Sequence, residues 1–347
     1  MGIKEVNQKL VELKNLSSEE VRIAMSEILS GAADEESIKE FLIGLKRKGE
    51  RAEEVVALVE TLYEHATLVE IPDRTVDIVG TGGDGFNTIN ISTSSAILTT
   101  ASGARVIKHG NRAASSASGA ADLLEALGIK IDLNADQLAE CVRKIGIGFA
   151  FAPKFHPAMR FAAPARKSLG VPTVFNILGP LANPARPKAV AIGVARLEMF
   201  ELVAKVFAER GCEGFVFRGE EGLDEISIAG PTAIYQICDK RYELHRFDPR
   251  SIGIELESLE SIRGGDAKLN ASVTEGVFRG KSGPAREAIL LNSAMAIAAF
   301  KGDFNLPLET QLANGYVLAK AGIDSGRALE LIQRWRELSN ELAKSSL

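Results

Sequence analysis

Two polar segments hold most of the residues that could act on a phosphorylated ligand. Residues 80–93 begin Gly-Thr-Gly-Gly-Asp-Gly, and residues 108–116 begin Lys-His-Gly-Asn-Arg. Glycines let the main chain approach a ligand closely, so that bare N–H groups can point at anionic oxygens. Serine and threonine hydroxyls add donors, while Lys108 and Arg112 supply positive charge. These residue types together predict a site for a phosphorylated ligand.

The elements around these segments predict that both face one pocket. Residues 75–79 are rich in β-branched side chains and predict a buried strand. Residues 92–102 predict a helix that stops at Gly103, and residues 104–107 predict a second strand. A strand–helix–strand unit of this kind forms a right-handed crossover between parallel strands. Ligands bind beyond the carboxyl ends of such strands, which is where both polar segments fall.

The glycine segment also fits the Gly-x-Gly-x-x-Gly fingerprint of dinucleotide-binding proteins, but three features argue against that reading. The predicted helix does not open on the glycines, because residues 86–88 intervene. Asp84 would lie against a pyrophosphate with no cation to relieve the repulsion. The second strand runs into Lys108, where a ribose-binding acid is expected. We therefore expect neither a nicotinamide nor a flavin cofactor.

Asp84 among phosphate-binding amides is better explained by a metal ion or a sugar hydroxyl in the site. Magnesium takes oxygen ligands and commonly bridges one or two carboxylates to substrate phosphates. The adjacent acids Asp224 and Glu225 follow residues 214–217, which predict another strand. They could hold a metal-bound diphosphate at the end of that strand. For these two acids alone, the alternative is a solvated turn, and the residues leave both readings open.

Several long strings resemble the anthranilate phosphoribosyltransferase family in order and spacing. They are GTGGDG, NIST, KHGNRAASS, SGAADLLEALG, the stretch of residues 151–184, and GLDEIS. The likeness covers nearly the whole chain beyond the first helices. Members of the family join anthranilate to phosphoribosyl pyrophosphate and release diphosphate, in tryptophan biosynthesis. The resemblance implies this pentosyltransferase reaction, with Mg²⁺ as cofactor.

The resemblance also implies a two-domain fold of the nucleoside phosphorylase and phosphoribosyltransferase type. Its large domain is α/β, with a central, mostly parallel sheet flanked by helices, and its small N-terminal domain is all-helical. We place the helical domain at residues 1–71, joined by helices from about residues 169–184. The α/β catalytic domain is placed at residues 72–347. Hinges are expected near residues 68–73 and 180–187.

Carried over by position, the resemblance assigns residues to each ligand. Those expected to bind phosphoribosyl pyrophosphate are Gly80, Gly83, Asp84, Thr88, Asn90, Ile91, Ser92, Thr93, Lys108, His109, Gly110, Asn111, Arg112, Ala113, Ala114, Ser115, Ser116 and Ala120. Those expected to contact anthranilate are Gly80, Asn111 and Arg166, with His109 and His156 near the acceptor path. Those expected to contact magnesium are Ser92, Asp224 and Glu225. No acid, base or nucleophile is assigned; Asn111, Lys108 and Arg166 are expected to position the substrates.

Some of these residues have simpler readings. Ala120 departs from the family pattern, because many members carry serine there, so only a backbone contact remains possible. Arg166 suits anthranilate because a guanidinium binds a carboxylate through two parallel hydrogen bonds; taken alone, it reads as a surface arginine. His109 could equally be a hydrogen-bonded histidine near the core. No Cys-His or Ser-His-Asp constellation points to a covalent intermediate.

Composition limits the remaining possibilities. The 347 residues include 46% hydrophobic residues and carry a net charge of −5. No apolar run approaches the ~18 residues that a membrane helix needs, and no signal-peptide hydrophobic region is recognisable. The three cysteines fit reduced thiols in a cytoplasm. The acidic balance argues against the rival function of binding nucleic acid.

A second rival, a pyrimidine nucleoside phosphorylase, shares the two-domain fold but has a different phosphate-loop sequence.

Residues 1–71 lack proline and predict three helices, the first opened by a capping box from Ser17 to Glu20. Three short helices make a thin core that needs a partner, and the resemblance suggests a homodimer through this helical part. Further along, the sequence predicts a hairpin around Asp239 and Lys240.

Overall fold

The chain begins with a bundle of short amphipathic helices. The structure is a computed structural model that describes residues 1–113 and 117–344. Within the first 71 residues the helices are α1 (Ile3–Val11), α2 (Ser18–Ser30), α3 (Glu35–Lys48) and α4 (Ala52–Glu64). The predicted capping box opens α2, where the Glu20 N–H donates to the Ser17 hydroxyl over 3.3 Å. The sequence predicts three helices and misses α1, which is short and packs on α3.

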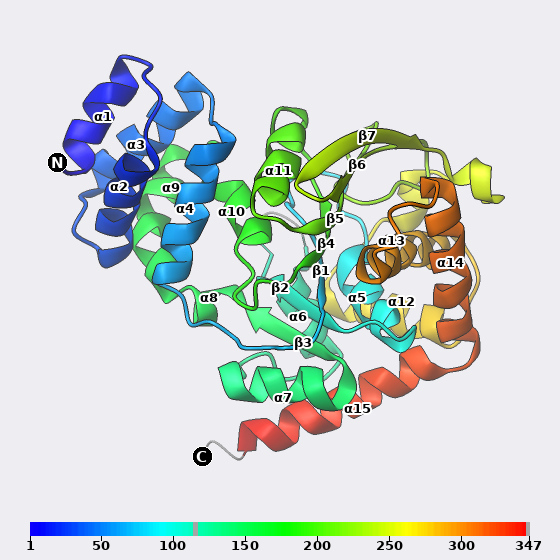
Figure 1. Ribbon diagram of the computed structural model, residues 1–347. Coiled ribbons are helices and arrows are strands. Elements are labelled where there is room, and N and C mark those ends of the chain that lie inside the picture. The colour runs from blue at the N-terminus through cyan, green and yellow to red at the C-terminus, as the bar shows by residue number, and fades with distance from the viewer. Residues whose placement is uncertain (114–116, 345–347) are drawn as a thin grey trace.

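A segment from the middle of the chain covers this bundle. It contains α8 (Ala152–Phe155), the 3₁₀ helix η1 (Pro157–Ala162), α9 (Ala163–Leu169) and α10 (Phe175–Leu181). η1 packs on α2, α9 on α3, and α10 on α4 (Figure 1). This packing begins at Pro157, which is earlier than the helices from about residues 169–184 that the sequence places against the bundle.

The described residues of the larger part of the chain form a seven-stranded sheet. Its strands are β1 (Val76–Gly80), β2 (Val106–Gly110), β3 (Ile147–Phe151), β4 (Ala189–Gly193), β5 (Glu213–Gly219), β6 (Thr232–Cys238) and β7 (Arg241–Phe247). Their order is β3-β2-β1-β4-β5-β6-β7. The first five strands in this order are parallel, and β6 and β7 form the predicted antiparallel hairpin. Asp239 and Lys240 turn it with φ of 52° and 60°.

Helices cover both faces of the sheet (Figure 1). The helices of this larger part are α5 (Ile91–Ala101), α6 (Ala120–Ala126), α7 (Ala135–Ile145), α11 (Leu197–Glu209), α12 (Ala267–Phe278), α13 (Pro284–Lys301), α14 (Leu308–Asp324) and α15 (Arg327–Lys344), with short 3₁₀ turns η2 (Pro249–Ile252) and η3 (Leu259–Ile262). α5 and α13 pack on one face, whereas α11 and the N-terminal bundle lie against the other. No helix of the described residues is long and apolar enough to cross a membrane.

The sheet separates two hydrophobic cores, because successive strand residues point to opposite faces. In β4, Ala189 and Ala191 face the core shared with α5 and α13. Val190 and Ile192 face the core shared with α11 and the helical bundle. The carboxyl edge of the sheet therefore lies between two faces: the α5 side, covered by α5 and α13, and the bundle side, covered by α11 and the helical bundle. A side chain at that edge can point to either side.

Candidate active site

Two glycines at the ends of neighbouring strands make room for the acidic pair. Gly80 of β1 and Gly193 of β4 are paired in the sheet register. A Cβ on Gly193 would lie 1.7 Å from the Asp224 carbonyl oxygen, and a Cβ on Gly80 would lie 2.3 Å from Asp224 Oδ2. Neither position can hold a larger residue without moving Asp224. The acidic pair thus lies over the carboxyl edge of the sheet, with Asp224 and Glu225 each only 7% exposed, and not in a solvated turn.

Each acid is held by a main-chain donor from the predicted phosphate segment. The Gly82 N–H donates to Asp224 Oδ2 over 2.6 Å. The Ser92 N–H, in the first turn of α5, donates to Glu225 Oε1 over 3.0 Å. The positive end of the helix dipole favours a carboxylate at this place. The second oxygen, Glu225 Oε2, is buried and accepts no hydrogen bond from the described residues.

Burial and the closeness of the carboxylates to one another disfavour their ionised forms. Burial raises the pKa of Asp224 to about 7, and the charge of the neighbouring Asp84 adds to this increase. Burial also raises the pKa of Glu225 well above its ordinary value, with a further contribution from Asp224. A cation brought among these carboxylates would reverse both effects, because an opposite charge favours the ionised form.

Lys108 lies beside the acids on the α5 face of the sheet. Its Nζ donates to the Ile78 carbonyl over 2.5 Å and to Ser92 Oγ over 3.3 Å. The side chain is 1% exposed, and burial lowers its pKa although Asp77, Glu225 and Asp224 oppose this effect. The structure therefore brings Lys108 and Ser92 to the acidic pair, as the sequence predicts for one phosphate and metal site.

The carboxylates at this edge fit a magnesium ion that takes some of its ligands from the protein and the others from a substrate. Among the described residues, no three side chains of His, Cys, Asp or Glu are placed to hold an ion by themselves. Magnesium is usually bound by one or two carboxylates, with substrate phosphates and water completing its shell. The unpartnered oxygen of Glu225 and the adjacent Asp224 supply such ligands.

The glycine segment forms an exposed loop before α5. Gly82, Gly83 and Gly85 have φ of 72°, 82° and 81°, a region in which a side chain is strained. Nothing lies within 4 Å of a Cβ built on any of the three, so their conformation and not lack of space requires glycine. Asp84 Oδ1 accepts the Phe86 N–H over 3.1 Å and shapes the turn. The helix opens only at Ile91, one residue before the predicted start, so it does not begin on the glycines.

The residues that follow the loop anchor it to the α/β domain. Thr88 forms a β-bridge with Arg263. Asn90 donates to the Ser118 carbonyl over 2.9 Å and accepts from Asn270 over 2.8 Å, so its amide ties the first polar segment to the chain before α6 and to α12. Ile91 and Thr93 are buried at the start of α5. These side chains position the loop and the helix N-terminus.

The second polar segment begins inside the sheet and not after it. The predicted strand of residues 104–107 is displaced in the structure, where β2 extends to Gly110 and includes Lys108 and His109. Because neighbours in a strand point to opposite faces, Lys108 faces α5 and His109 faces α10. A Cβ on Gly110 would lie 2.9 Å from the Phe149 ring and 3.2 Å from Ala120 Cβ, so the strand end is tightly packed.

Two neutral histidines lie on the bundle side of this edge. His109 Nδ1 donates to the Gly179 carbonyl over 2.8 Å, and His156 Nε2 donates to the Ala182 carbonyl over 2.7 Å. Their rings are 5.1 Å apart. Burial, with a smaller contribution from His156, lowers the pKa of His109 to about 3. Burial also lowers the pKa of His156. Each ring therefore keeps one unprotonated nitrogen, buried and without a partner among the described residues, that can accept a hydrogen bond.

Asp77 supports His109 from within the sheet. Its Oδ1 accepts the His109 N–H over 3.2 Å, and its Oδ2 accepts from Asn183 over 2.8 Å. Asn183 also donates to the Ile107 carbonyl over 2.8 Å. This buried network joins β1 and β2 to the segment after α10, within residues 180–187, where the sequence predicts a hinge.

Arg166, on α9, is a partly buried cation on the bundle side. Its guanidinium lies 5.9 Å from the centre of the Phe175 ring. No carboxylate forms an ion pair with it among the described residues, and burial lowers its pKa. An anionic ligand would compensate this buried charge better than water does.

The remaining predicted residues lie at the exposed end of the second segment. Asn111 Oδ1 accepts the Arg112 N–H over 2.7 Å. Arg112 itself is exposed and paired with Asp122 at 2.9 Å and Glu125 at 2.6 Å, so α6 already engages its charge. Ala113 donates its N–H to Asp122 over 3.0 Å. Ala114, Ser115 and Ser116 lie outside the described residues.

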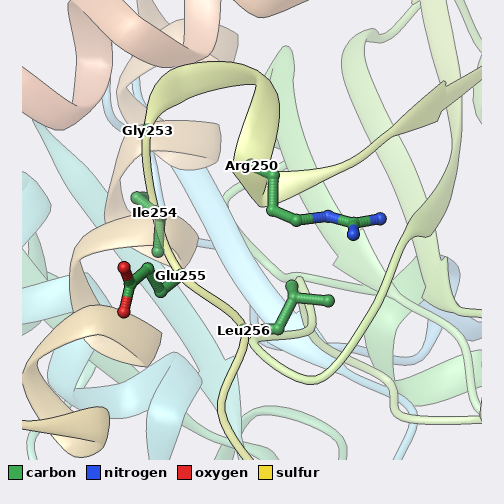
Figure 2. Close-up of a pocket in the computed structure, with 5 residues that line it drawn as sticks. All are labelled: Arg250, Gly253, Ile254, Glu255 and Leu256. Atoms are coloured by element: carbon green, nitrogen blue, oxygen red, sulfur yellow. The ribbon is translucent and has the colours of Figure 1, made fainter.

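A cavity elsewhere on the molecule carries none of this chemistry. A hollow of about 370 Å³ is lined by Arg250, Gly253, Ile254, Glu255 and Leu256 (Figure 2). No predicted site residue lines it. Arg250 is paired with Asp248 at 2.6 Å. The carboxyl edge of the sheet, with its unpartnered buried groups, remains the better candidate.

Sequence reasoning missed Gly193, which is as closely packed on Asp224 as the predicted Gly80. A signal existed in the sequence. The string Ala-Val-Ala-Ile-Gly predicts a buried strand that ends in glycine, as the strand before Gly80 does. Only the pairing of the two strands shows that the two glycines are neighbours.

The two-part architecture and its acidic edge define a class of transferase. Residues 4–66 match the family described as "Glycosyl transferase family, helical bundle domain", and residues 72–329 match "Glycosyl transferase family, a/b domain". The chain therefore belongs to the glycosyl transferases that combine a helical bundle with an α/β domain. This match confirms the predicted fold class.

Relatives define the particular family. The chain is 50% identical to the anthranilate phosphoribosyltransferase of Rhodococcus jostii (strain RHA1), over 97% of this chain and 93% of the relative. It is 48% identical to the enzyme of the same name from Nocardia farcinica (strain IFM 10152), over 96% and 98%. The chain belongs to the anthranilate phosphoribosyltransferase family, as the sequence motifs indicate.

Solved structures of the family superpose closely on the chain. The Thermus thermophilus anthranilate phosphoribosyltransferase has a TM-score of 0.89 and 35% identity, over 96% of this chain and 99% of that one. The Saccharomyces cerevisiae enzyme in complex with PRPP and Mg has a TM-score of 0.88 and 29% identity, over 98% of each chain. A further S. cerevisiae structure holds 4-fluoroanthranilate.

Proposed function

We propose that this chain transfers the phosphoribosyl group of 5-phosphoribosyl 1-pyrophosphate to the amine of anthranilate, giving N-(5-phosphoribosyl)anthranilate and diphosphate, in tryptophan biosynthesis. The observation that carries the proposal is the division of the site by β2. Lys108 faces the acidic, phosphate-binding side, and the next residue, His109, faces a side with neutral acceptors and the partly buried Arg166. Two substrates of different chemistry can meet at the edge between them.

The donor is assigned to the α5 side of that edge. The exposed glycine loop and the N-terminus of α5 offer N–H groups to phosphate oxygens, and Lys108 adds a buried charge. Asp224, Glu225 and Ser92 would hold Mg²⁺; the S. cerevisiae relative carries both PRPP and Mg. When bound, the ion would neutralise charge that develops on the departing diphosphate.

The acceptor is assigned to the bundle side, with Gly80, Asn111 and Arg166 as its contacts. An aromatic amine is neutral at pH 7 and needs no base before it attacks the anomeric carbon. The neutral nitrogens of His109 and His156 can accept hydrogen bonds along the acceptor path without adding a charge. Holding the amine and the anomeric carbon together can lower the barrier by up to ~7–11 kcal/mol. Positioning and leaving-group electrostatics thus account for catalysis without a covalent intermediate.

Arg166→Ala should raise the KM for anthranilate by about 10-fold to 100-fold, because a charged hydrogen-bonded pair is lost. The KM for the sugar donor should change much less, since Arg166 lies on the opposite side of the edge from the acids. Steady-state kinetics with each substrate varied in turn measures both values. Lys167→Ala, an exposed change on the same helix, is the matched control and should leave both unchanged. Equal effects of Arg166→Ala on the two substrates would contradict the assignment.

One assay tests the reaction itself. Purified protein with anthranilate, phosphoribosyl pyrophosphate and Mg²⁺ should consume anthranilate, which is followed by the loss of its fluorescence. Removal of Mg²⁺ with a chelator should stop the reaction. Phosphorolysis of thymidine or uridine in place of this reaction would favour a nucleoside phosphorylase and overturn the proposal.

The domain arrangement and the homodimer belong to the same proposal. We place a helical domain at residues 1–71, with the segment of about 169–184, against a catalytic domain at residues 72–347. The bundle exposes Val11 by 78% and Leu13 by 56%, apolar side chains that a second subunit would cover. Light scattering during size-exclusion chromatography should give twice the monomer mass, and a monomer at micromolar concentration would contradict the dimer. The cytoplasmic location and the absence of a nucleic-acid partner stay predictions from composition.

A further inference from the structure

The acidic pair is carried by backbone that has no regular structure of its own. Residues 220–230, between β5 and β6, form turns and bends. In this stretch the buried carboxylates of Asp224 and Glu225 lie next to each other and close to Asp84, so like charges push them apart when they are ionised. Main-chain hydrogen bonds of a helix or strand do not hold them in place. Contacts from elsewhere must do so.

Asn292 supplies such a contact from the middle of α13. Its Oδ1 accepts the Ile226 N–H over 2.8 Å, and its Nδ2 donates to the Ile226 carbonyl over 3.1 Å. The second Nδ2 hydrogen is donated to the Ala288 carbonyl over 2.9 Å. The Asn292 side chain is fully buried, and its amide hydrogen-bonds both the N–H and the carbonyl of Ile226, the residue that follows Glu225. Such a pair fixes the position and the orientation of the two peptide groups that flank the Ile226 Cα.

The same helix also supports the other side of the acidic pair. α13 packs along α5, and Ser95 of α5 donates its hydroxyl to the Ile289 carbonyl of α13 over 3.2 Å. α5 in turn carries the Ser92 N–H that binds Glu225. Glu225 is therefore fixed on one side by α5 and on the other through Ile226 by α13. Both helices contribute to one hydrophobic core.

We propose that Asn292 is a positioning residue for the metal-bound diphosphate. It holds the main chain after Glu225 so that the Asp224 and Glu225 carboxylates stay together at the sheet edge, ready for the cation. The inference rests on the proposed function, in which these two acids contact Mg²⁺. Asn292 is fully buried and forms no hydrogen bond with either acid among the described residues, so it acts through the main chain of Ile226.

Asn292→Ala removes both hydrogen bonds to the Ile226 main chain and tests the proposal. Residues that orient metal ligands from behind typically cost 10-fold to 100-fold in metal affinity when they are changed. The Mg²⁺ concentration for half-maximal rate should therefore rise about 10-fold or more, while the KM for anthranilate should stay within about 2-fold. Titration of Mg²⁺ at saturating substrates measures the first, and substrate variation at saturating Mg²⁺ measures the second.

Ser293→Ala is the matched control. Ser293 is the next residue and equally buried; its hydroxyl donates to the Ile289 carbonyl of its own helix over 2.7 Å, with a longer contact of 3.4 Å to the Ser95 carbonyl of α5, and it does not contact Ile226 through a hydrogen bond among the described residues. Its loss should lower the thermal unfolding temperature without changing the Mg²⁺ requirement. If Asn292→Ala and Ser293→Ala give the same Mg²⁺ dependence, Asn292 only stabilises the core and the proposal is overturned. Asn292→Ser, which is smaller and cannot span the same two groups, is judged by the same criterion if the alanine variant is insoluble.

Glu225→Gln separates failure of this inference from failure of the proposed function. If Glu225→Gln leaves the Mg²⁺ requirement unchanged, the acids are not the metal ligands and the proposed function loses its metal site. If Glu225→Gln raises the requirement and Asn292→Ala does not, only the role of Asn292 is contradicted. The expected result is a rise for both variants.

Discussion

The double substitution of Asp224 with Asn and Glu225 with Gln should reduce phosphoribosyl transfer by about 100-fold or more. Each amide keeps an oxygen for the N–H donor that now binds the acid, so the local packing is preserved. What is lost is the negative charge that would hold Mg²⁺ against the departing diphosphate. Loss of single preorganised groups of this kind typically costs about 10-fold to 1,000-fold in rate or metal affinity. The remaining activity should need far more Mg²⁺.

The same double variant should fold at least as stably as the unchanged protein at pH 8. Because burial raises the pKa of Asp224 to about 7, the folded protein binds this proton more tightly than the unfolded chain does. Without metal, the folded state therefore loses stability as the pH rises from the unfolded pKa of about 4 through the folded pKa of about 7. Neutral amides remove this loss. Thermal unfolding without Mg²⁺ at pH 5 and pH 8 measures it.

Glu220→Gln is the matched control for the double variant, because Glu220 is an exposed acid of the same segment paired with Arg246. It should leave both the rate and the Mg²⁺ requirement unchanged. A Mg²⁺ titration of the double variant that superposes on that of the unchanged protein would exclude Asp224 and Glu225 as metal ligands.

Gly193→Ala should lower kcat/KM by about 100-fold, although Gly193 touches no substrate in our account. Its new methyl group would lie 1.7 Å from the Asp224 carbonyl oxygen, so the acidic segment must move away from the sheet edge. A misplacement of about 1 Å in a catalytic arrangement can cost about 100-fold in rate. Steady-state kinetics, with circular dichroism and thermal unfolding to confirm folding, measures the effect.

Gly230→Ala is the control for Gly193→Ala. Gly230 lies on the same segment as the acids, but nothing lies within 4 Å of a Cβ built there. It should retain nearly full activity. If a folded Gly193→Ala variant keeps full activity and an unchanged Mg²⁺ requirement, then the close contact between β4 and Asp224 does not position the acids.

The parts of this fold that the sequence predicts well are those set by local chemistry. The Ser17 capping box, the hairpin turn at Asp239 and Lys240, and the strand–loop–helix unit around Gly80 depend on residues near one another in the chain. The family strings add the identity of the ligands. Local spacing was less informative for α1, which is short, and for Lys108 and His109, polar residues that the strand β2 nevertheless includes.

Contacts between distant residues could not be predicted from spacing. Asn292 and Ile226, which are joined by hydrogen bonds, lie 66 residues apart in the chain. The sequence shows Asn292 only as a polar residue that interrupts an apolar run. The packing of Gly193 on Asp224 likewise depends on which strands are neighbours. Opposite orientations of Lys108 and His109 follow from the pleat of β2, which becomes visible only when both are known to lie in the strand. Sequence therefore predicts which groups bind the ligands, and the fold shows which contacts hold those groups in place.

The most direct test of the account is a crystal structure with phosphoribosyl pyrophosphate and Mn²⁺, which replaces Mg²⁺ and is located by its anomalous scattering. We expect a metal peak within about 2.5 Å of a carboxylate oxygen of Asp224 or Glu225, a typical distance for oxygen ligands. The diphosphate should lie between this peak and the loop at Gly82. A metal peak away from both acids, with the diphosphate bound elsewhere, would contradict the account.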